Sequence, residues 1–172
     1  MSNIKFVSFE NDHAQQILDQ GLNQKLLEFK PEHRKYSLYL KEIGMSFTGL
    51  LNNKPVVAGG IFPLWEGTAE GWVLATKEIN NYPITISKVI KQRTDMMIKN
   101  NFIRRLQTSV KADCDTAIRF AEWLGLKQEG LMKAYGPDGE DFYRYARVIK
   151  WVLWEIYMQV KRKLRLQNLM QK

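Results

Sequence analysis

Apolar and polar residues alternate in short runs along the chain, and this two-residue period predicts β-strands. The first run is Ile4–Phe9. Three more runs are Ser46–Leu51, Val56–Phe62 and Glu70–Thr76, separated by the turn Asn52-Asn53-Lys54 and by a loop around Trp65-Glu66-Gly67. Short alternating runs joined by such turns are typical of antiparallel hairpins, so we expect a three-stranded meander here.

Other segments repeat apolar residues every three or four positions, which is the period of a helix with one buried face. This spacing predicts a helix through Ile17 and Leu18, with Asn11 or Asp12 as its N-cap. Further helices are expected over Pro31–Ile43, ending at Gly44, over the segment that begins at Pro83, and over Asp113–Gly125. Strands are expected at Leu106–Val110, Glu129–Tyr135 and Phe142–Ile149, the last two joined by the turn Gly136-Pro137-Asp138-Gly139.

This order of elements predicts an α/β (α+β) fold with a mixed central sheet flanked by helices. Strand–helix–strand passages in the second half favour parallel neighbours, whereas the meander forms antiparallel pairs. The pair Gly59-Gly60 lies inside a predicted strand, where it indicates a bulge or a close approach of two backbones. A chain of 172 residues with 45% apolar and 26% charged side chains fits one domain. We assign the domain to residues 1–149 and an added C-terminal basic amphipathic helix to residues 150–172.

The net charge of +8 is concentrated at the C-terminus. Residues 150–172 hold six lysines and arginines against Glu155 alone, which accounts for +5 of the total. The first half of this segment is apolar on nearly every side, so it needs a cover from its own domain or from another chain. Its candidate partner-binding residues are Trp151, Trp154, Tyr157, Lys161, Arg162, Lys163 and Arg165.

Several classes of protein are disfavoured by the composition. The N-terminus lacks the pattern of a signal peptide, and no apolar run approaches the ~18–20 residues of a membrane span. With Cys114, His13 and His33 as the only thiol and imidazole groups, no ligand set for a zinc site is expected. We therefore predict neither a metal nor a transmembrane segment.

One segment carries a family resemblance. Residues 114–126 read Cys-Asp-Thr-Ala-Ile-Arg-Phe-Ala-Glu-Trp-Leu-Gly-Leu, followed by Lys-Gln-Glu-Gly. This is similar to the GNAT acyltransferase segment Asn-x-x-Ala-Ile-x-Leu-Tyr-Glu-x-Leu-Gly-Phe, and the resemblance extends over about residues 4–148. Pro55–Gly60, Trp72–Thr76, Ile118–Phe120 and Ala134–Gly139 more specifically resemble a GNAT-like internal virion protein of short-tailed phages and prophages.

The resemblance implies an acyl-CoA wedge between the strands Glu70–Thr76 and Leu106–Val110, with the pyrophosphate at the amino end of the helix after Pro83. Free amides and the helix dipole make such an end attractive to anions. The candidate cofactor-binding residues are Leu74, Ala75, Asn80, Asn81, Ile84, Thr85, Ile86 and Cys114. Capping of the helix is the simpler role for the two asparagines and Thr85.

The sequence departs from active members of that family in three places. The segment Glu78–Thr85, at the position of the pyrophosphate loop, contains no glycine, and Pro83 removes one amide. We expect Ile84, Thr85 and Ile86 to begin a regular helix with free amides, and Glu78–Tyr82 to stand clear of the wedge. The tyrosine that serves as the acid in that family is replaced here by Ala121, and the family's asparagine at the start of the same helix is replaced by Cys114.

Glu70 and Glu78 are the carboxylates best placed to act as a general base toward an amine, although solvated strand-end charges have the same pattern. Tyr135, Tyr143 or Tyr145 could replace the missing acid, or could simply pack in the hairpin. Cys114 is either a reactive thiol at a helix amino terminus or a small half-buried apolar group.

Three functions follow from these residues. The first is a phage-encoded, virion-associated structural or interaction protein with degenerate acetyl-CoA machinery and no cofactor. It would be located in the host cytoplasm and the virion, and would bind other virion proteins or a second copy of itself through the C-terminal helix. The alternative is an active N-acetyltransferase that uses acetyl-CoA and acts on an amine. The third is binding of nucleic acid by the basic tail.

Overall fold

The computed structural model describes residues 4–20, 33–150 and residue 159, and the expected C-terminal helix with its partner-binding residues therefore lies outside the described residues. The elements, in chain order, are β1 (Ile4–Ser8), α1 (Asn11–Asp19), α3 (His33–Glu42), β2 (Ser46–Leu51), β3 (Lys54–Trp65), β4 (Thr68–Ala75), the 3₁₀-helix η1 (Lys77–Asn81), α4 (Pro83–Asn100), β5 (Arg105–Lys111), α5 (Asp115–Trp123), β6 (Lys127–Met132) and β7 (Phe142–Val148).

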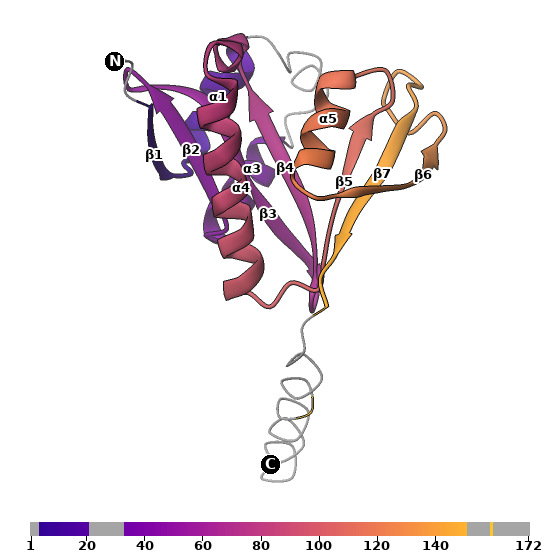
Figure 1. Cartoon of the computed structure of the whole chain (residues 1–172). Helices are drawn as coiled ribbons and strands as arrows, with labels where there is room; N and C mark the ends of the chain where they lie inside the picture. The colour runs from indigo at the N-terminus through magenta and orange to yellow at the C-terminus, as the bar shows by residue number, and fades with distance from the viewer. Residues whose placement is uncertain (1–3, 21–32, 151–158, 160–172) are drawn as a thin grey trace.

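The described strands form one seven-stranded sheet in the order β1-β2-β3-β4-β5-β7-β6. The β4–β5 pair is parallel and every other neighbouring pair is antiparallel. The sheet is therefore two antiparallel halves, β1–β4 and β5–β7–β6, joined by one parallel contact. This confirms the predicted mixed sheet and the meander within it (Figure 1).

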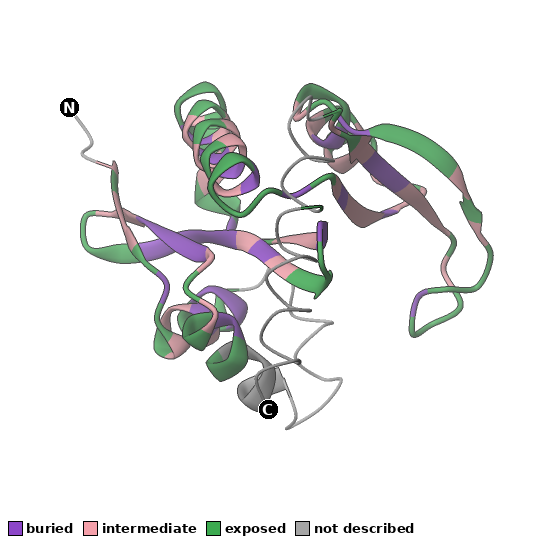
Figure 2. Ribbon diagram, turned by 90° about the horizontal axis from the view of Figure 1, so that it is seen from below, coloured by how far each residue is buried: buried purple, intermediate pink, exposed green. Residues whose placement is uncertain are grey.

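Helices cover both faces of the sheet (Figure 2). On one face α1 and α3 pack against β3 and β4, and their core centres on Phe9, Ile17 and Ala58. On the other face, Ile86 and Ile90 of α4 pack on the β1–β4 half, while α5 packs on the second half through Ala121. Even-numbered residues of β4 thus point toward α1 and α3, and odd-numbered residues point toward α4.

Local sequence explains most of the element boundaries. Asn52 and Asn53 both have positive φ, of 50° and 63°, as the two-residue turn between β2 and β3 requires. Pro83 occupies the first turn of α4, where its missing N–H leaves no helical bond unmade. Gly44 and Gly125, with φ of 71° and 86°, follow the ends of α3 and α5.

The predicted cap of α1 is wrong. Glu10 is the N-cap instead of Asn11 or Asp12, and it forms a capping box with His13. The Nδ1 atom of His13 accepts the N–H of Glu10 at 3.2 Å and lies 3.0 Å from Oγ1 of the buried Thr48. The imidazole therefore takes the role that Glu or Gln has in the usual capping box. A search for short polar N-cap residues overlooks this arrangement.

Gly60 marks the close backbone approach that the sequence indicated. A Cβ at this position would lie 2.3 Å from the carbonyl oxygen of Met45 and 2.8 Å from Cα of Ser46. The bulges of β3 lie elsewhere, opposite Gly49/Leu50 and between Pro63 and Trp65. The close approach lets Ile61 donate its N–H to the Met45 carbonyl at 3.0 Å, at the entry to β2.

We predict that Gly60→Ala destabilises the protein by about 1–3 kcal/mol, because backbone atoms must move to admit the methyl group. The matched control is Gly130→Ala, a strand position where the added Cβ meets nothing within 4 Å. Urea unfolding of both variants measures the difference. Equal urea midpoints of unfolding for the two variants would show that the backbone at Gly60 has room for a methyl group.

Candidate functional site

The parallel contact between β4 and β5 is short, and the strands diverge beyond it (Figure 1). Only three pairs are in register, namely Thr68 with Arg105, Ala69 with Leu106, and Glu70 with Gln107. One step further, the hydroxyl of Thr108 donates to the carbonyl of Gly71 at 3.0 Å. Beyond this point the backbones of β4 and β5 no longer pair with each other. An extended ligand could therefore form hydrogen bonds with the backbone of β4 there.

A chain of polar side chains crosses the sheet where the strands begin to diverge. Nη1 of Arg144, on β7, donates to both carboxylate oxygens of Glu70, at 2.8 and 3.1 Å. Nε2 of Gln107 donates to Oε2 of Glu70 at 3.0 Å, and its Oε1 accepts Nε–H of Arg105 at 2.8 Å. Arg105 also forms a two-fold ion pair with Glu129 of β6. The network therefore runs Glu129–Arg105–Gln107–Glu70–Arg144.

This network lies on the same face of the sheet as α1 and α3, over strands β4, β5, β7 and β6. Glu70 and Arg144 keep 18% and 24% of their side-chain surface exposed, so both are accessible to a ligand although largely desolvated. The guanidinium of Arg105 lowers the pKa of the Glu129 carboxyl below its ordinary value. The sequence identified Glu70, but nothing in its one-dimensional pattern linked Glu70 to Arg144, which lies 74 residues away.

Glu78 does not join this site. It lies on η1, beyond the end of β4, and its partners are local. The Thr76 hydroxyl and its own backbone lower the pKa of the Glu78 carboxyl. The structure therefore separates the two carboxylates that the sequence proposed as alternatives, and only Glu70 lies at the divergence of β4 and β5.

The amino end of α4 offers fewer free amides than expected. The N–H of Ile86 donates to the Tyr82 carbonyl at 3.1 Å, and Ile86 is buried against the sheet, so its predicted free amide is wrong. Ile84 and Thr85 occupy the first turn, where helix geometry supplies no partner for the N–H groups. Tyr82 is the N-cap and no side chain caps it, so the expected capping by Asn80, Asn81 or Thr85 is also wrong.

The remaining cofactor candidates are spread over β4 and α5. Leu74 packs toward α1 and α3, whereas Ala75 packs toward α4. Cys114 is the N-cap of α5, half-buried, and its thiol makes no capping hydrogen bond. The structure does not bring Cys114 into the polar network described above.

Neither Ala121 nor Tyr145 can supply the acid that the resemblance implies. Ala121 is buried against Val110 and Leu126. Tyr145 is 1% exposed, with its hydroxyl 3.3 Å from Oε1 of Glu122 and 3.4 Å from Oε1 of Gln128. Burial, followed by the Glu122 carboxylate, raises the pKa of Tyr145.

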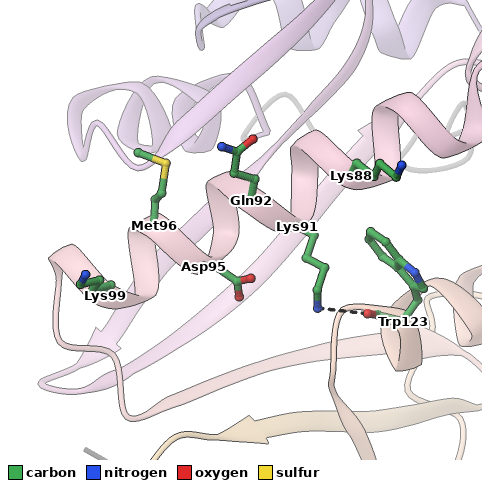
Figure 3. Close-up of a pocket in the computed structure, with 7 residues that line it drawn as sticks. All are labelled: Lys88, Lys91, Gln92, Asp95, Met96, Lys99 and Trp123. Atoms are coloured by element: carbon green, nitrogen blue, oxygen red, sulfur yellow. Dashed lines mark hydrogen bonds between the residues drawn. The ribbon is translucent and has the colours of Figure 1, made fainter.

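A shallow hollow of about 470 Å³ lies between α4 and α5, and sequence reasoning missed it. Lys91 donates to the carbonyl of Trp123 at 3.3 Å and lies 5.3 Å from the centre of its ring (Figure 3). Asp95 pairs with Arg147 of β7 at 2.6 Å. The hollow is lined by Lys88, Lys91, Gln92, Asp95, Met96, Lys99 and Trp123. These contacts tie α4 to the second half of the sheet on the face opposite Glu70.

Within the described ranges, no three histidine, cysteine or acidic side chains are grouped closely enough to hold a metal ion. No helix in the same part of the chain is both long and apolar enough to cross a membrane.

No protein-family model and no curated protein matches this sequence. Solved structures do match. Ard1 from Thermoplasma volcanium is 13% identical, with a TM-score of 0.71 over 86% of this chain and 99% of that one. A GNAT-family acetyltransferase from Bacillus anthracis is 17% identical, with a TM-score of 0.64 over 86% of this chain and 96% of that one. Ribosomal-protein-S18-alanine N-acetyltransferase from Escherichia coli is 17% identical, with a TM-score of 0.69 over 87% and 96%.

The TM-scores and the coverage of both chains establish a shared fold. The seven-stranded mixed sheet with flanking helices is the fold of GNAT acetyltransferases, as the sequence resemblance predicted.

We predict that Glu129→Gln lowers stability near pH 7, and that this effect shrinks as the pH falls below 4.5 and through the lowered pKa of the folded state. The pKa of Glu129 is depressed in the folded state, so its ion pair with Arg105 stabilises the fold above the ordinary pKa of 4.5. That contribution is lost as the pH falls through the folded pKa. Urea unfolding of the wild type and the variant across this range measures it. A difference that does not shrink in acid would contradict the assignment.

Proposed function

We propose that this protein is an acyl-CoA-dependent N-acyltransferase that acts on an amine, with Glu70 as the proton acceptor. The observation that carries the proposal is the position of Glu70, on the last paired step of β4 and β5, where the two strands separate. A partly exposed carboxylate at this point can receive a proton from an amine that approaches the gap. The named acetyltransferases with this fold support the class of reaction.

The residues present fit a CoA thioester. The unpaired edge of β4 beyond Gly71 can take an extended arm by backbone hydrogen bonding. The amides of Ile84 and Thr85, at the positive end of α4, suit a pyrophosphate, although η1 replaces the glycine loop. When bound, the thioester supplies an activated acyl carbonyl.

The chain's own residues prepare the amine. Gln107 donates to Oε2 of Glu70 and is itself held by Arg105, so the carboxylate has one orientation. Glu70 takes a proton from the incoming ammonium and leaves the nitrogen lone pair free to attack. Ala121 carries no proton, and Tyr145 is enclosed beside Glu122. Tyr143 packs against the core beneath α5, and Tyr135 packs against Phe142. We therefore assign protonation of the leaving sulfur to solvent.

A second candidate is the phage virion-associated interaction protein with degenerate acetyl-CoA machinery. The observation that favours it is η1, which fills the place of a glycine-rich phosphate loop with a 3₁₀-helix and leaves Pro83 where an amide would serve. Acetyl-CoA binding separates the two candidates. Nucleic-acid binding depended on the basic tail, which lies outside the described residues.

We predict that acetyl-CoA binds saturably in calorimetry of the full chain, and that Pro83→Ala tightens binding by about tenfold. The substitution restores an N–H at the helix terminus, and a hydrogen bond to a charged group contributes roughly 1.5–3 kcal/mol. Ser87→Ala, one turn further along α4, is the control and leaves the affinity unchanged. Absence of heat at millimolar acetyl-CoA for both wild type and Pro83→Ala would favour the interaction protein.

We predict that Glu70→Gln lowers kcat by about 10²–10⁴-fold while acetyl-CoA affinity is retained, because the amide cannot accept the proton. Glu78→Gln decides between the two carboxylates that the sequence offered, and we expect it to keep wild-type turnover. Steady-state rates of CoA release with a panel of primary amines provide the measurement. Loss of turnover in Glu78→Gln, but not in Glu70→Gln, would reverse the assignment.

A further inference from the structure

We propose that the amine acceptor is a free α-amino acid, whose ammonium binds Glu70 and whose carboxylate binds Arg144. This inference deepens the function proposed above and depends on the same site. The transfer forms an N–C bond and breaks the thioester C–S bond. Of the two protons that the ammonium loses, one passes through Glu70 to solvent and the other ends on the thiol of CoA.

The first argument is the occupancy of Glu70. Nη1 of Arg144 lies within hydrogen-bonding distance of both Glu70 oxygens, and Gln107 takes a second position on one of them. An ammonium that binds Glu70 therefore competes with Arg144 for the carboxylate and weakens that ion pair. A guanidinium whose ion pair is weakened in this partly buried position needs a new anion. The carboxylate of an amino acid is such an anion, and it arrives on the same molecule.

The second argument is charge balance. The ion pair of Glu70 with Arg144 is neutral, and so is the neighbouring pair of Arg105 with Glu129. A zwitterion exchanges one ion pair for two and leaves the site neutral. A simple amine or a polyamine would add positive charge beside an arginine whose ion pair is weakened, which is unfavourable in a desolvated site.

The third argument is the position of the two backbones. Glu70 is on β4 and Arg144 is on β7, with β5 between them. Strands two positions apart in a sheet are separated by about 10 Å. The side chains therefore reach each other across β5, and each can hold one end of a small ligand placed between them.

Two further polar residues follow Glu70 and Gln107 along their strands. Trp72 and Ser109 are the next residues on the same face after Glu70 and Gln107. Among the described residues, Nε1 of Trp72 and Oγ of Ser109 are buried without a hydrogen-bond partner. Ser109 is also the register partner of Arg144 across β5 and β7. Indole N–H donates only and the serine hydroxyl can donate, so both atoms suit a carboxylate oxygen.

The test compares three ligands with the same amine and side chain: L-leucine, L-leucinamide and 3-methylbutylamine. On the carbon that carries the amine, the first has a carboxylate, the second a neutral amide and the third a hydrogen atom. Binding to the full chain is measured by calorimetry without acetyl-CoA, and kcat/KM is then measured with acetyl-CoA. We expect L-leucine to exceed both other ligands by about tenfold or more in each measurement, because a site built to pair a charged group rejects analogues that lack it. The same comparison with glycine and phenylalanine and their amides removes the influence of side-chain size.

Substitutions of two arginines on β7 test whether Arg144 causes the preference for a carboxylate. Arg144→Gln should reduce the preference for the acid over the amide to within about twofold, whereas Arg144→Lys should retain part of it. The matched control is Arg147→Gln, an ion-paired arginine on the same strand that points to the opposite face and contacts Asp95. We expect this control to keep the full preference. Because the ligand series uses the wild type alone, poor folding of a variant does not remove the test.

The outcomes separate the two proposals. If the three ligands bind and react equally well, the amino-acid inference is overturned while the acyltransferase function stands. A preference that survives unchanged in Arg144→Gln also overturns the inference. If L-leucine binds through Arg144 but no amine is acylated, the binding site is supported and the proposed function fails.

Discussion

The short parallel contact between β4 and β5 is the constraint on which the rest of this structure depends. Two antiparallel half-sheets, β1–β4 and β5–β7–β6, share only three register pairs, from Thr68/Arg105 to Glu70/Gln107. The joint is reinforced on each face by side chains. Glu70 and Arg144 bridge it on one face, and Asp95 and Arg147 bridge it on the other. Backbone pairing between β4 and β5 stops beyond the joint, and the ionisable groups gather at that point because they connect the two half-sheets.

Polar groups at the joint serve the fold and the site together. Arg144 keeps Glu70 from being an isolated, desolvated charge, and the bond from Gln107 fixes the direction of the carboxylate. Removing one partner of this pair leaves a partly buried charge without its counter-ion, which is unfavourable. The proposed chemistry thus uses a group that the protein must already keep in place for stability.

Most of the fold was predictable because it depends on local patterns. Alternation predicted β2, β3 and β4, and turn chemistry at Asn52-Asn53 and the positive φ of Gly125 agree with the expected boundaries. The errors concern contacts between residues. The cap of α1 depends on His13 rather than on a short polar residue, and β6 covers Lys127–Met132 instead of Glu129–Tyr135. For the site, sequence identified Glu70 but missed Arg144 and the contacts of Lys91, because pairing between distant strands leaves no local periodicity.

The division of the sheet has a consequence for the order of folding. The hairpins β2–β3 and β3–β4 in one half, and β6–β7 in the other, join strands that are close in sequence, so their pairing costs little loop entropy. The β4–β5 joint instead requires a crossover through the whole of α4. We therefore expect these hairpins to form before the joint, an order that pulsed hydrogen exchange at Ala69 and at Ala58 would report. The site would then be completed only when the two halves of the sheet meet, after the local hairpins have formed.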